Sequence, residues 1–289
     1  MSANANAVFV MRRVGEELAR LREGAGLRQD DIAVRLGCTR HTVSKIERGK
    51  AFPTPDQLEE MLREYGANAG QRTAVASMVD QGRSQGRAWY EQARFRALYP
   101  GLSYRYFSLE DGAERISAHS GTYVPGLLQT REYIEALAAY GQKDEGLERR
   151  EAFVEARMNR KAILSRSDPV ILDALILEAA LRSMVGGPEV MRTQLKYLIA
   201  CAELPNVTLR VIPFSAGAAS AVGIPFTIMD FPGDGDRSVV WQDVVRGDVA
   251  EDDPADVRRI RRKFADLTAS ALSEVETVRY IEEIEKEIP

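Results

Sequence analysis

The segment from Gln29 to Arg48 constrains the fold of this chain more than any other part of it. It reads QDDIAVRLGCTRHTVSKIER, and its apolar residues are Ile32, Ala33, Leu36, Cys38, Val43 and Ile46. This spacing indicates two short amphipathic helices, with Gly37 between them. Helices that cross steeply through a tight turn need a small residue at the crossing and a glycine where the chain reverses. Ala33 and Gly37 meet these needs, so the segment predicts a helix-turn-helix unit.

The second helix of this unit is predicted to enter the major groove of DNA and to contact the bases. Thr39 should begin it, because a threonine hydroxyl accepts a hydrogen bond from a backbone N–H of the first turn. Val43 and Ile46 would face the core. A helix fits the major groove, where Arg and Lys reach the acceptor atoms of guanine. The predicted base contacts lie on the outer face of this helix and are Arg40, His41, Ser44 and Lys45.

A second set of residues, near the helix ends, is predicted to contact phosphates and so to fix the register on DNA. These residues are Gln29, Thr39, Thr42, Arg48 and Lys50. Residues 1–50 contain ten Lys and Arg against six Asp and Glu, a net charge of +4, whereas the whole chain carries −4 and the remainder therefore −8. Because phosphate contacts depend on nearby cations, a basic head on an acidic body can still bind DNA.

Further helices are expected on both sides of the unit. Val14, Leu18 and Leu21 predict one that ends at Gly24 or Gly26. The run Thr54-Pro55-Asp56-Gln57 has the cap, the proline and the glutamine that are typical of a helix start. The alternative interpretation is a plain capped four-helix bundle whose basic residues form a solvated face.

Residues 12–65, and above all the segment TVSKIERGKAFPTPDQLEEML, resemble the helix-turn-helix domain of the Cro and phage-repressor (XRE) type. In that family a glutamate of the ERG segment pairs with an arginine of the first helix. The resemblance therefore implies that Glu47 is an internal brace with Arg22 as its partner, and that it does not contact DNA.

Beyond Pro100, β-type runs alternate with helical ones, which predicts an α+β body. Five short strands are expected, in ERISAHS, PVILDALI, NVTLRVIP, PFTIMDF and RSVVWQDVV. Helices are expected over about 130–140, 145–165 and 178–203, followed by two C-terminal helices that begin at Asp253-Pro254 and at Ser273. The predicted domains are a helix-turn-helix domain (1–68), a helical linker (69–99) that contains the hinge-like GRSQGR, and an α+β sensor or interaction domain (100–289).

Most of residues 100–285 resembles the C-terminal domain of the actinobacterial WhiJ-like regulators. The segments that carry this resemblance are YVPGLLQTREYIEAL, EARMNRKAIL, LEAALRSMVGG, EVMRTQLKYLI, LPNVTLRVIPFSAGA and SALSEVET. The resemblance implies an antitoxin-like transcriptional regulator that is encoded beside a small partner protein. It supplies no established ligand, and His119 stands where we expect an aromatic residue.

An aromatic cluster leads into the VPGLLQT segment. Its members, Tyr104, Tyr106, Phe107 and Tyr123, together with Tyr99, are candidates for a ligand pocket. Since aromatic clusters also build ordinary cores, and no convergent charged group is evident, the core interpretation is favoured. VPGLLQT itself is expected to turn a strand into a helix capped near Thr130.

Catalysis finds little support in the sequence, so we expect no enzyme, no cofactor and no metal. No phosphate loop, nucleophile elbow or paired-histidine metal motif occurs, and GDGDR at 233–237 lacks the third glycine of a dinucleotide site. His119 with Cys201, or Glu110 with Glu178, are the residual candidate pairs. The most apolar run, Pro169–Leu181, is interrupted by two acidic residues, and the N-terminus reverses the order of a signal peptide, so a cytoplasmic protein without a membrane span is expected.

Two functions fit these patterns. The first is a sequence-specific transcription regulator that binds double-stranded DNA as a homodimer and receives a signal from a small neighbour-encoded protein or a ligand. The alternative is an antitoxin-like interaction module that sequesters a small partner protein and binds DNA only for autoregulation. The two C-terminal helices are expected to bury their own core, and a role for one of them in the dimer is the alternative to this.

Overall fold

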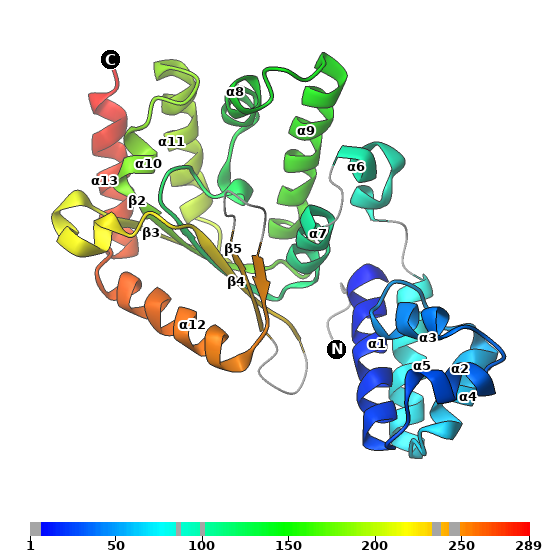
Figure 1. Ribbon diagram of the computed structural model, residues 1–289. Coiled ribbons are helices and arrows are strands. Elements are labelled where there is room, and N and C mark those ends of the chain that lie inside the picture. The colour runs from blue at the N-terminus through cyan, green and yellow to red at the C-terminus, as the bar shows by residue number, and fades with distance from the viewer. Residues whose placement is uncertain (1–6, 85–87, 99–101, 233–237, 243–248) are drawn as a thin grey trace. The chain divides into compact units, whose positions relative to one another are not determined.

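The computed structural model describes residues 7–84, 88–98, 102–232, 238–242 and 249–289 (Figure 1). Contacts divide the chain into two compact units, which we call the head (through Ala88) and the body (from Trp89). The fold is α+β: the head is helical, and the body combines a mixed sheet with helices. No helix in the described ranges has the length and hydrophobicity needed to cross a membrane.

The described residues of the head form five helices. They are α1 (Ala7–Gly24), α2 (Gln29–Arg35), α3 (Arg40–Glu47), α4 (Pro55–Glu64) and α5 (Ala69–Ser84). Their core is formed by fully buried aliphatic side chains, which include Leu18, Ile32 and Val43. The α5 helix lies in the segment predicted as a linker, yet it packs against α1 and buries Val75 within the head.

Local sequence signals explain where these helices begin. The Thr39 hydroxyl accepts a hydrogen bond from the Thr42 N–H at 3.2 Å, and Thr54 and Gln57 form a reciprocal capping box. Between α2 and α3, Gly37 has a φ of 60°, a left-handed conformation that glycine adopts without steric cost. The predicted pair of helices joined by a glycine turn is therefore present.

The body contains one six-stranded sheet in the order β3-β2-β1-β4-β5-β6. The strands are β1 (Arg115–Ser120), β2 (Ile171–Leu177), β3 (Val207–Ile212), β4 (Phe226–Asp230), β5 (Ser238–Gln242) and β6 (Val249–Glu251). β1, β2 and β3 are parallel, whereas β4, β5 and β6 are joined by antiparallel pairing. Parallel neighbours need long crossovers, and the helices between β1, β2 and β3 provide them.

The body's helical elements account for most of its remaining described residues. They are η1 (Trp89–Glu91), α6 (Ala93–Leu98), α7 (Leu102–Gly112), η2 (Gly126–Leu128), α8 (Arg131–Gly141), α9 (Leu147–Arg160), η3 (Lys161–Leu164), α10 (Glu178–Arg182), α11 (Pro188–Ala202), η4 (Phe214–Ala221), α12 (Pro254–Ala269) and α13 (Glu274–Glu287). The helix α12 lies on one side of the sheet, and α8, α9 and α11 lie on the other (Figure 1).

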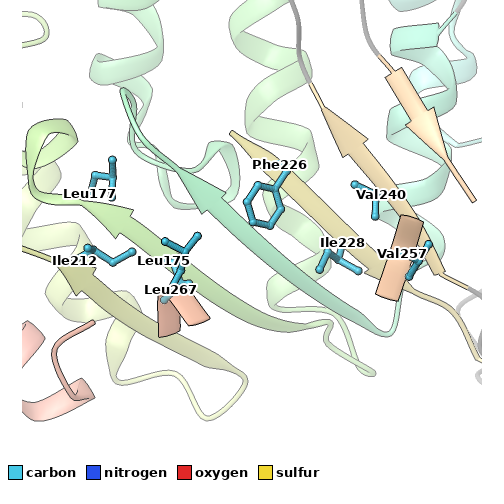
Figure 2. Packing of buried hydrophobic residues seen from close by; sticks show 8 residues of the cluster. All are labelled: Leu175, Leu177, Ile212, Phe226, Ile228, Val240, Val257 and Leu267. Carbon is cyan, nitrogen blue, oxygen red and sulfur yellow. The ribbon is translucent and has the colours of Figure 1, made fainter. Parts of the chain in front are cut away.

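The face of the sheet toward α12 carries a compact apolar core. Figure 2 shows its side chains, which come from four strands and from α12: Leu175, Leu177, Ile212, Phe226, Ile228, Val240, Val257 and Leu267. At the edge strand β3, the Val211 N–H donates to the Thr277 hydroxyl at 3.0 Å, and the Val211 carbonyl accepts from the Leu272 N–H. The chain from α12 to α13 thereby covers an edge that would otherwise offer unpaired backbone groups.

Two of the elements that the sequence did not predict are β6 and α7. The sixth strand, β6, is three residues long, and its sequence Val-Ala-Glu has little β-character, so the prediction of five strands missed it. The aromatic-rich stretch before β1 forms the helix α7, which we had not predicted. The GDGDR motif, at 233–237, and the second half of GRSQGR, at 85–87, lie outside the described residues.

Candidate nucleic-acid interface

The α3 helix separates an inward face from an outward one. Val43 and Ile46 are 0% and 2% exposed, because they pack into the core of the head. His41 and Lys45 are exposed, and the Arg40 side chain is 69% exposed. Ser44 and Thr42 are half-buried beside them. The outward face therefore presents cationic and hydroxyl groups from the first turns of one capped helix.

An acidic residue lies beside this face. The Asp30 carboxylate is 3.9 Å from Arg40 Nε, and both side chains are solvent-exposed. Sequence reasoning missed Asp30 as a neighbour of Arg40, because only the crossing of α2 and α3 brings the two residues together. An exposed ion pair of this kind contributes little to stability, so Arg40 can leave Asp30 readily for another partner.

Arg22 and Glu47 form a buried ion pair that joins α1 to the end of α3. Arg22 Nε and Nη2 donate to the two Glu47 oxygens at 2.7 and 3.0 Å, and the side chains are 10% and 3% exposed. The hydrogen bonds to Glu47 raise the pKa of Arg22. Arg22 Nη1 also donates to the Leu27 carbonyl at 2.8 Å. This arrangement ties the two ends of the helix-turn-helix unit to α1 and points Glu47 away from solvent.

The predicted phosphate contacts have different surroundings. Gln29 Nε2 donates to Glu47 Oε2 at 2.7 Å, so a phosphate contact by this side chain would compete with the Arg22–Glu47 pair. Arg48 Nε donates to the Ser44 carbonyl at 3.1 Å, while its side chain stays at the surface. The Thr39 and Thr42 hydroxyls lie 3.1 Å apart at the start of α3. Lys50 is exposed just beyond α3.

Two glycines allow α1 to approach the end of α3 closely. Gly49 has a φ of 63°, and a Cβ placed there would lie 2.4 Å from the Arg12 Cα. A Cβ at Gly15 would lie 2.5 Å from the Ile46 carbonyl oxygen. Sequence reasoning did not single out Gly15, since a glycine inside an amphipathic helix gives no local sign of what will pack against it. The tight contact holds the outward face of α3 at one fixed orientation on the head.

The predicted pocket residues of the body line a cavity of about 610 Å³. Tyr106, Phe107 and Tyr123 are among its lining residues, whereas the Tyr104 side chain and Tyr99 lie outside the described part of the chain. The expectation that no charged group converges on the cluster is wrong. Glu110, Arg157 and Arg160 also line the cavity, because α9 folds back over α7.

The two residual catalytic pairs have separate surroundings. His119 Nε2 bonds to the Val222 carbonyl at 2.7 Å and its ring packs against Phe226, whereas Cys201 lies beside Tyr197 and Lys161, and burial raises the pKa of its thiol. A raised thiol pKa disfavours a cysteine nucleophile.

Glu110 pairs with Arg160, whereas Glu178 pairs with Arg182 and accepts from the Phe214 N–H at 2.7 Å. Burial opposes ionisation of Glu178, but its hydrogen bonds outweigh burial and hold its pKa below the usual value. Each carboxylate thus has its own cationic partner.

Comparison with known proteins agrees with this division of the chain. Residues 13–75 match the model of a helix-turn-helix domain, and residues 104–283 match a domain of unknown function, DUF5753. The chain is 36% identical over 55 residues, 19% of its own length and 71% of the relative's, to an uncharacterized HTH-type transcriptional regulator, y4dJ, of Sinorhizobium fredii. No solved structure matches. Because the second model spans more than half of the chain, this protein belongs to the family defined by DUF5753, and it carries a helix-turn-helix domain ahead of that domain.

Proposed function

We propose that this protein is a cytoplasmic, sequence-specific transcription regulator that binds double-stranded DNA through α3. One observation carries the proposal: α3 is capped, anchored by buried Val43 and Ile46, and presents exposed Arg40, His41 and Lys45 on its outer face. A helix of this kind enters the major groove with its N-terminal residues toward the base edges. The match to a helix-turn-helix domain and the name of the S. fredii relative support the same function.

The residue roles that we propose follow from position on α3. Arg40, His41, Ser44 and Lys45 read bases, while Thr39, Thr42, Arg48 and Lys50 contact phosphates. Gln29 takes part as a phosphate contact only if its amide leaves Glu47. The body contributes no catalysis in this proposal. It dimerises the protein and receives a signal from a ligand or from a small neighbour-encoded protein. Of these features, the WhiJ-like resemblance implies only the neighbour-encoded protein.

The test begins with capture of genomic fragments by the purified full chain, which yields a binding sequence. On that sequence Arg40→Ala should weaken binding by about 1 to 3 kcal/mol and relax one base preference. Lys50→Ala should weaken specific and random duplexes alike. Arg63→Ala, on α4 and outside the proposed interface, is the control and should change neither. Equal losses on random DNA for Arg40→Ala and Lys50→Ala would contradict the assignment.

A second candidate function is the antitoxin-like one, in which the body chiefly sequesters a small partner protein. It is favoured by two large apolar side chains, Phe214 at the start of η4 and Ile224 just beyond its end, which are 53% and 59% exposed. Co-expression of the full chain with the protein encoded next to it decides between the two functions. Tight co-purification that is lost in a Phe214→Ser, Ile224→Ser variant supports the antitoxin-like function, and purification of the chain alone opposes it.

A further inference from the structure

The helix α12 is a strongly basic segment within an acidic body. Residues 89–289 contain 25 Lys and Arg against 32 Asp and Glu, a net charge of −7. In α12, however, five of the six residues at 258–263 are basic, and this run reads RRIRRK. The helix as a whole carries +3, because only Asp256 and Asp266 oppose these cations. A local reversal of charge of this kind attracts an anionic partner.

The fold uses one side of α12 and leaves the other in solvent. Val257 and Leu267 are 3% and 4% exposed and belong to the core cluster on the sheet (Figure 2). Arg261, on the flank of the helix, donates to Asp230 at 2.6 Å and so serves the body itself. The exposed side of the helix, which we call the basic face, carries Arg258, Arg259, Arg262 and Lys263.

Most cations of the basic face have no partner within the protein. Arg259 Nη2 lies 2.8 Å from an oxygen of Asp256, but the two side chains are 70% and 44% exposed, so this pair opens readily. Across the described ranges, Arg258, Arg262 and Lys263 form no hydrogen bond and no ion pair. Their charges are therefore available to a molecule outside the chain.

The spacing of these cations is unfavourable for the helix itself. Arg258 and Arg262 are four residues apart, and so are Arg259 and Lys263, which makes each pair neighbours on one helix face. Like charges at this spacing destabilise a helix. No contact within the described body offsets the repulsion in the first pair. An anion bound along the basic face would remove it.

The backbone of DNA is the anion that fits the basic face best. A duplex presents one negative charge per about 1.7 Å of its axis, so a row of cations about 7.5 Å long can meet more than one phosphate. Guanidinium groups also match phosphate oxygens with paired hydrogen bonds. A membrane surface fits less well, because a helix bound there buries its apolar side in lipid, and the apolar side of α12 lies in the core.

We propose that the basic face of α12 is a second DNA contact, which binds phosphates outside the base pairs that α3 reads. Arg258, Arg262 and Lys263 each neutralise a phosphate, and Arg259 does so when it leaves Asp256. Phosphate contacts carry no sequence information, so this face adds affinity and no base preference. The inference rests on the proposed function for its ligand, DNA, but not for the base contacts of α3.

The test is the triple variant Arg258→Gln, Arg262→Gln, Lys263→Gln of the full chain, whose three positions are exposed. Fluorescence anisotropy measures its affinity, across a range of salt concentrations, for the captured sequence in a duplex with about 15 added base pairs on each side. Log affinity falls with log salt by about 0.9 per neutralised phosphate. The variant should therefore reduce this slope by about 2 to 3 and weaken binding at low salt at least about tenfold. The ratio of specific to random affinity should not change.

Two further variants separate a phosphate contact from other causes. Lys143→Gln, Arg149→Gln, Lys286→Gln removes three exposed positive charges from other surfaces of the body and should bind as wild type. Arg258→Lys, Arg262→Lys keeps the charge of the basic face and should keep the wild-type slope. Equal losses in the two triple variants would show an effect of net charge alone and overturn the proposal. An unchanged slope in the α12 triple variant would also overturn it and would leave the basic face to another partner, such as an acidic protein.

Failure of the proposed function has a different signature. If the wild-type chain prefers no sequence, or if Arg40→Ala leaves its preference intact, the assignment of α3 fails. The slopes of the α12 triple variant and its control can then still be compared on random duplexes, so the inference about α12 is judged separately. If the sequence preference is present and the slopes agree, only the inference about α12 fails.

Discussion

At the scale of single residues, the head depends on one buried charge pair. Arg22 and Glu47 are 10% and 3% exposed at the side chain, and Gln29 adds a third hydrogen bond to the same carboxylate. Removal of one partner from a buried pair leaves an uncompensated charge, which costs far more than the intact pair contributes. The pair is therefore a requirement of this fold more than a source of its stability.

Glu47→Gln should lower the free energy of unfolding of the head by about 3 kcal/mol, because the Arg22 charge stays buried beside a neutral amide. Glu23→Gln is the matched control. Glu23 also contacts Arg22, at 3.2 Å, but its side chain is 70% exposed, so its loss should stay within about 0.5 kcal/mol. Urea unfolding of the full chain, followed by far-ultraviolet circular dichroism, measures both. Equal effects of the two variants would refute the role of the buried pair.

A second residue-scale feature is His119 on β1. It is 2% exposed, and its Nδ1 has no hydrogen-bond partner in the described chain, while Nε2 bonds to the Val222 carbonyl. Burial lowers the pKa of His119, and the hydrogen bond to Val222 offsets this only in part. The neutral ring is thus the form that the folded body retains.

This lowered pKa has a defined consequence for stability. The unfolded chain takes up a proton at His119 near pH 6.5, whereas the folded chain does so only at lower pH. Stability from this group is complete above about pH 6.5 and falls by up to about 1.4 kcal/mol per pH unit as pH drops toward the folded pKa. His119→Phe should remove that component. Tryptophan fluorescence during urea unfolding at several pH values tests it, and an unchanged pH slope in the variant would contradict the expectation.

At the scale of elements, the orientation of α3 is set by its contact with α1. Gly49 follows α3 with a φ of 63°, and its Cα hydrogens face the Arg12 backbone. Gly37 has nearly the same φ, 60°, but no atom lies within 4 Å of a Cβ built there. The two glycines share a backbone conformation and differ in what surrounds them. Substituting each by alanine therefore distinguishes the free-energy cost of the left-handed conformation from the cost of a steric clash.

Gly37→Ala should cost about 1 to 2 kcal/mol, the penalty of the left-handed conformation for a residue with a Cβ. Gly49→Ala adds a backbone clash to the same penalty, so its loss should exceed that of Gly37→Ala by about 1 kcal/mol or more. It should also weaken DNA binding, because α1 and α3 must move apart. Thermal unfolding and DNA affinity of the two full-length variants test this pair, and equal losses of stability would show that the close contact is unimportant.

At the scale of the whole molecule, charge is divided between the two units. Residues 1–50 carry a net +4 within a chain of net −4. A polyanion such as DNA is attracted locally to the head, since screening at physiological salt limits charge interactions to about 8 Å.

If two heads act together, the captured sequences should contain two half-sites with centres about 34 Å apart, or a multiple of this distance. Insertion of about five base pairs between them turns one half-site to the opposite side of the duplex and should abolish cooperative binding, while insertion of about ten should restore it. Electrophoretic mobility shifts on the three duplexes measure this. Binding that is insensitive to spacing would indicate that each head acts alone.

Many of the helix starts and strands of this protein could be predicted from the sequence, because the signals that mark them are local. A cap and the N–H that it accepts are three residues apart, so Thr39, Thr54 and Ser273 mark the starts of α3, α4 and α13 without knowledge of the fold. Runs rich in β-branched residues likewise marked five of the six strands. Apolar spacing alone identified the inward face of α3, since a helix of known period places every residue on a known side.

Only the tertiary structure decided which elements meet. The order of the strands, the pairing of β6 with β5 and the meeting of Glu110 with Arg160, 50 residues along the chain, follow from packing that no local pattern encodes. The same holds for Gly15 and Gly49 and for the amide of Gln29, whose neighbours lie on other helices. The sequence by itself determined most of the elements and the inward and outward faces of α3, because hydrogen bonds and periodicity act over a few residues. The cavity and its charges arose only when distant helices closed over the sheet.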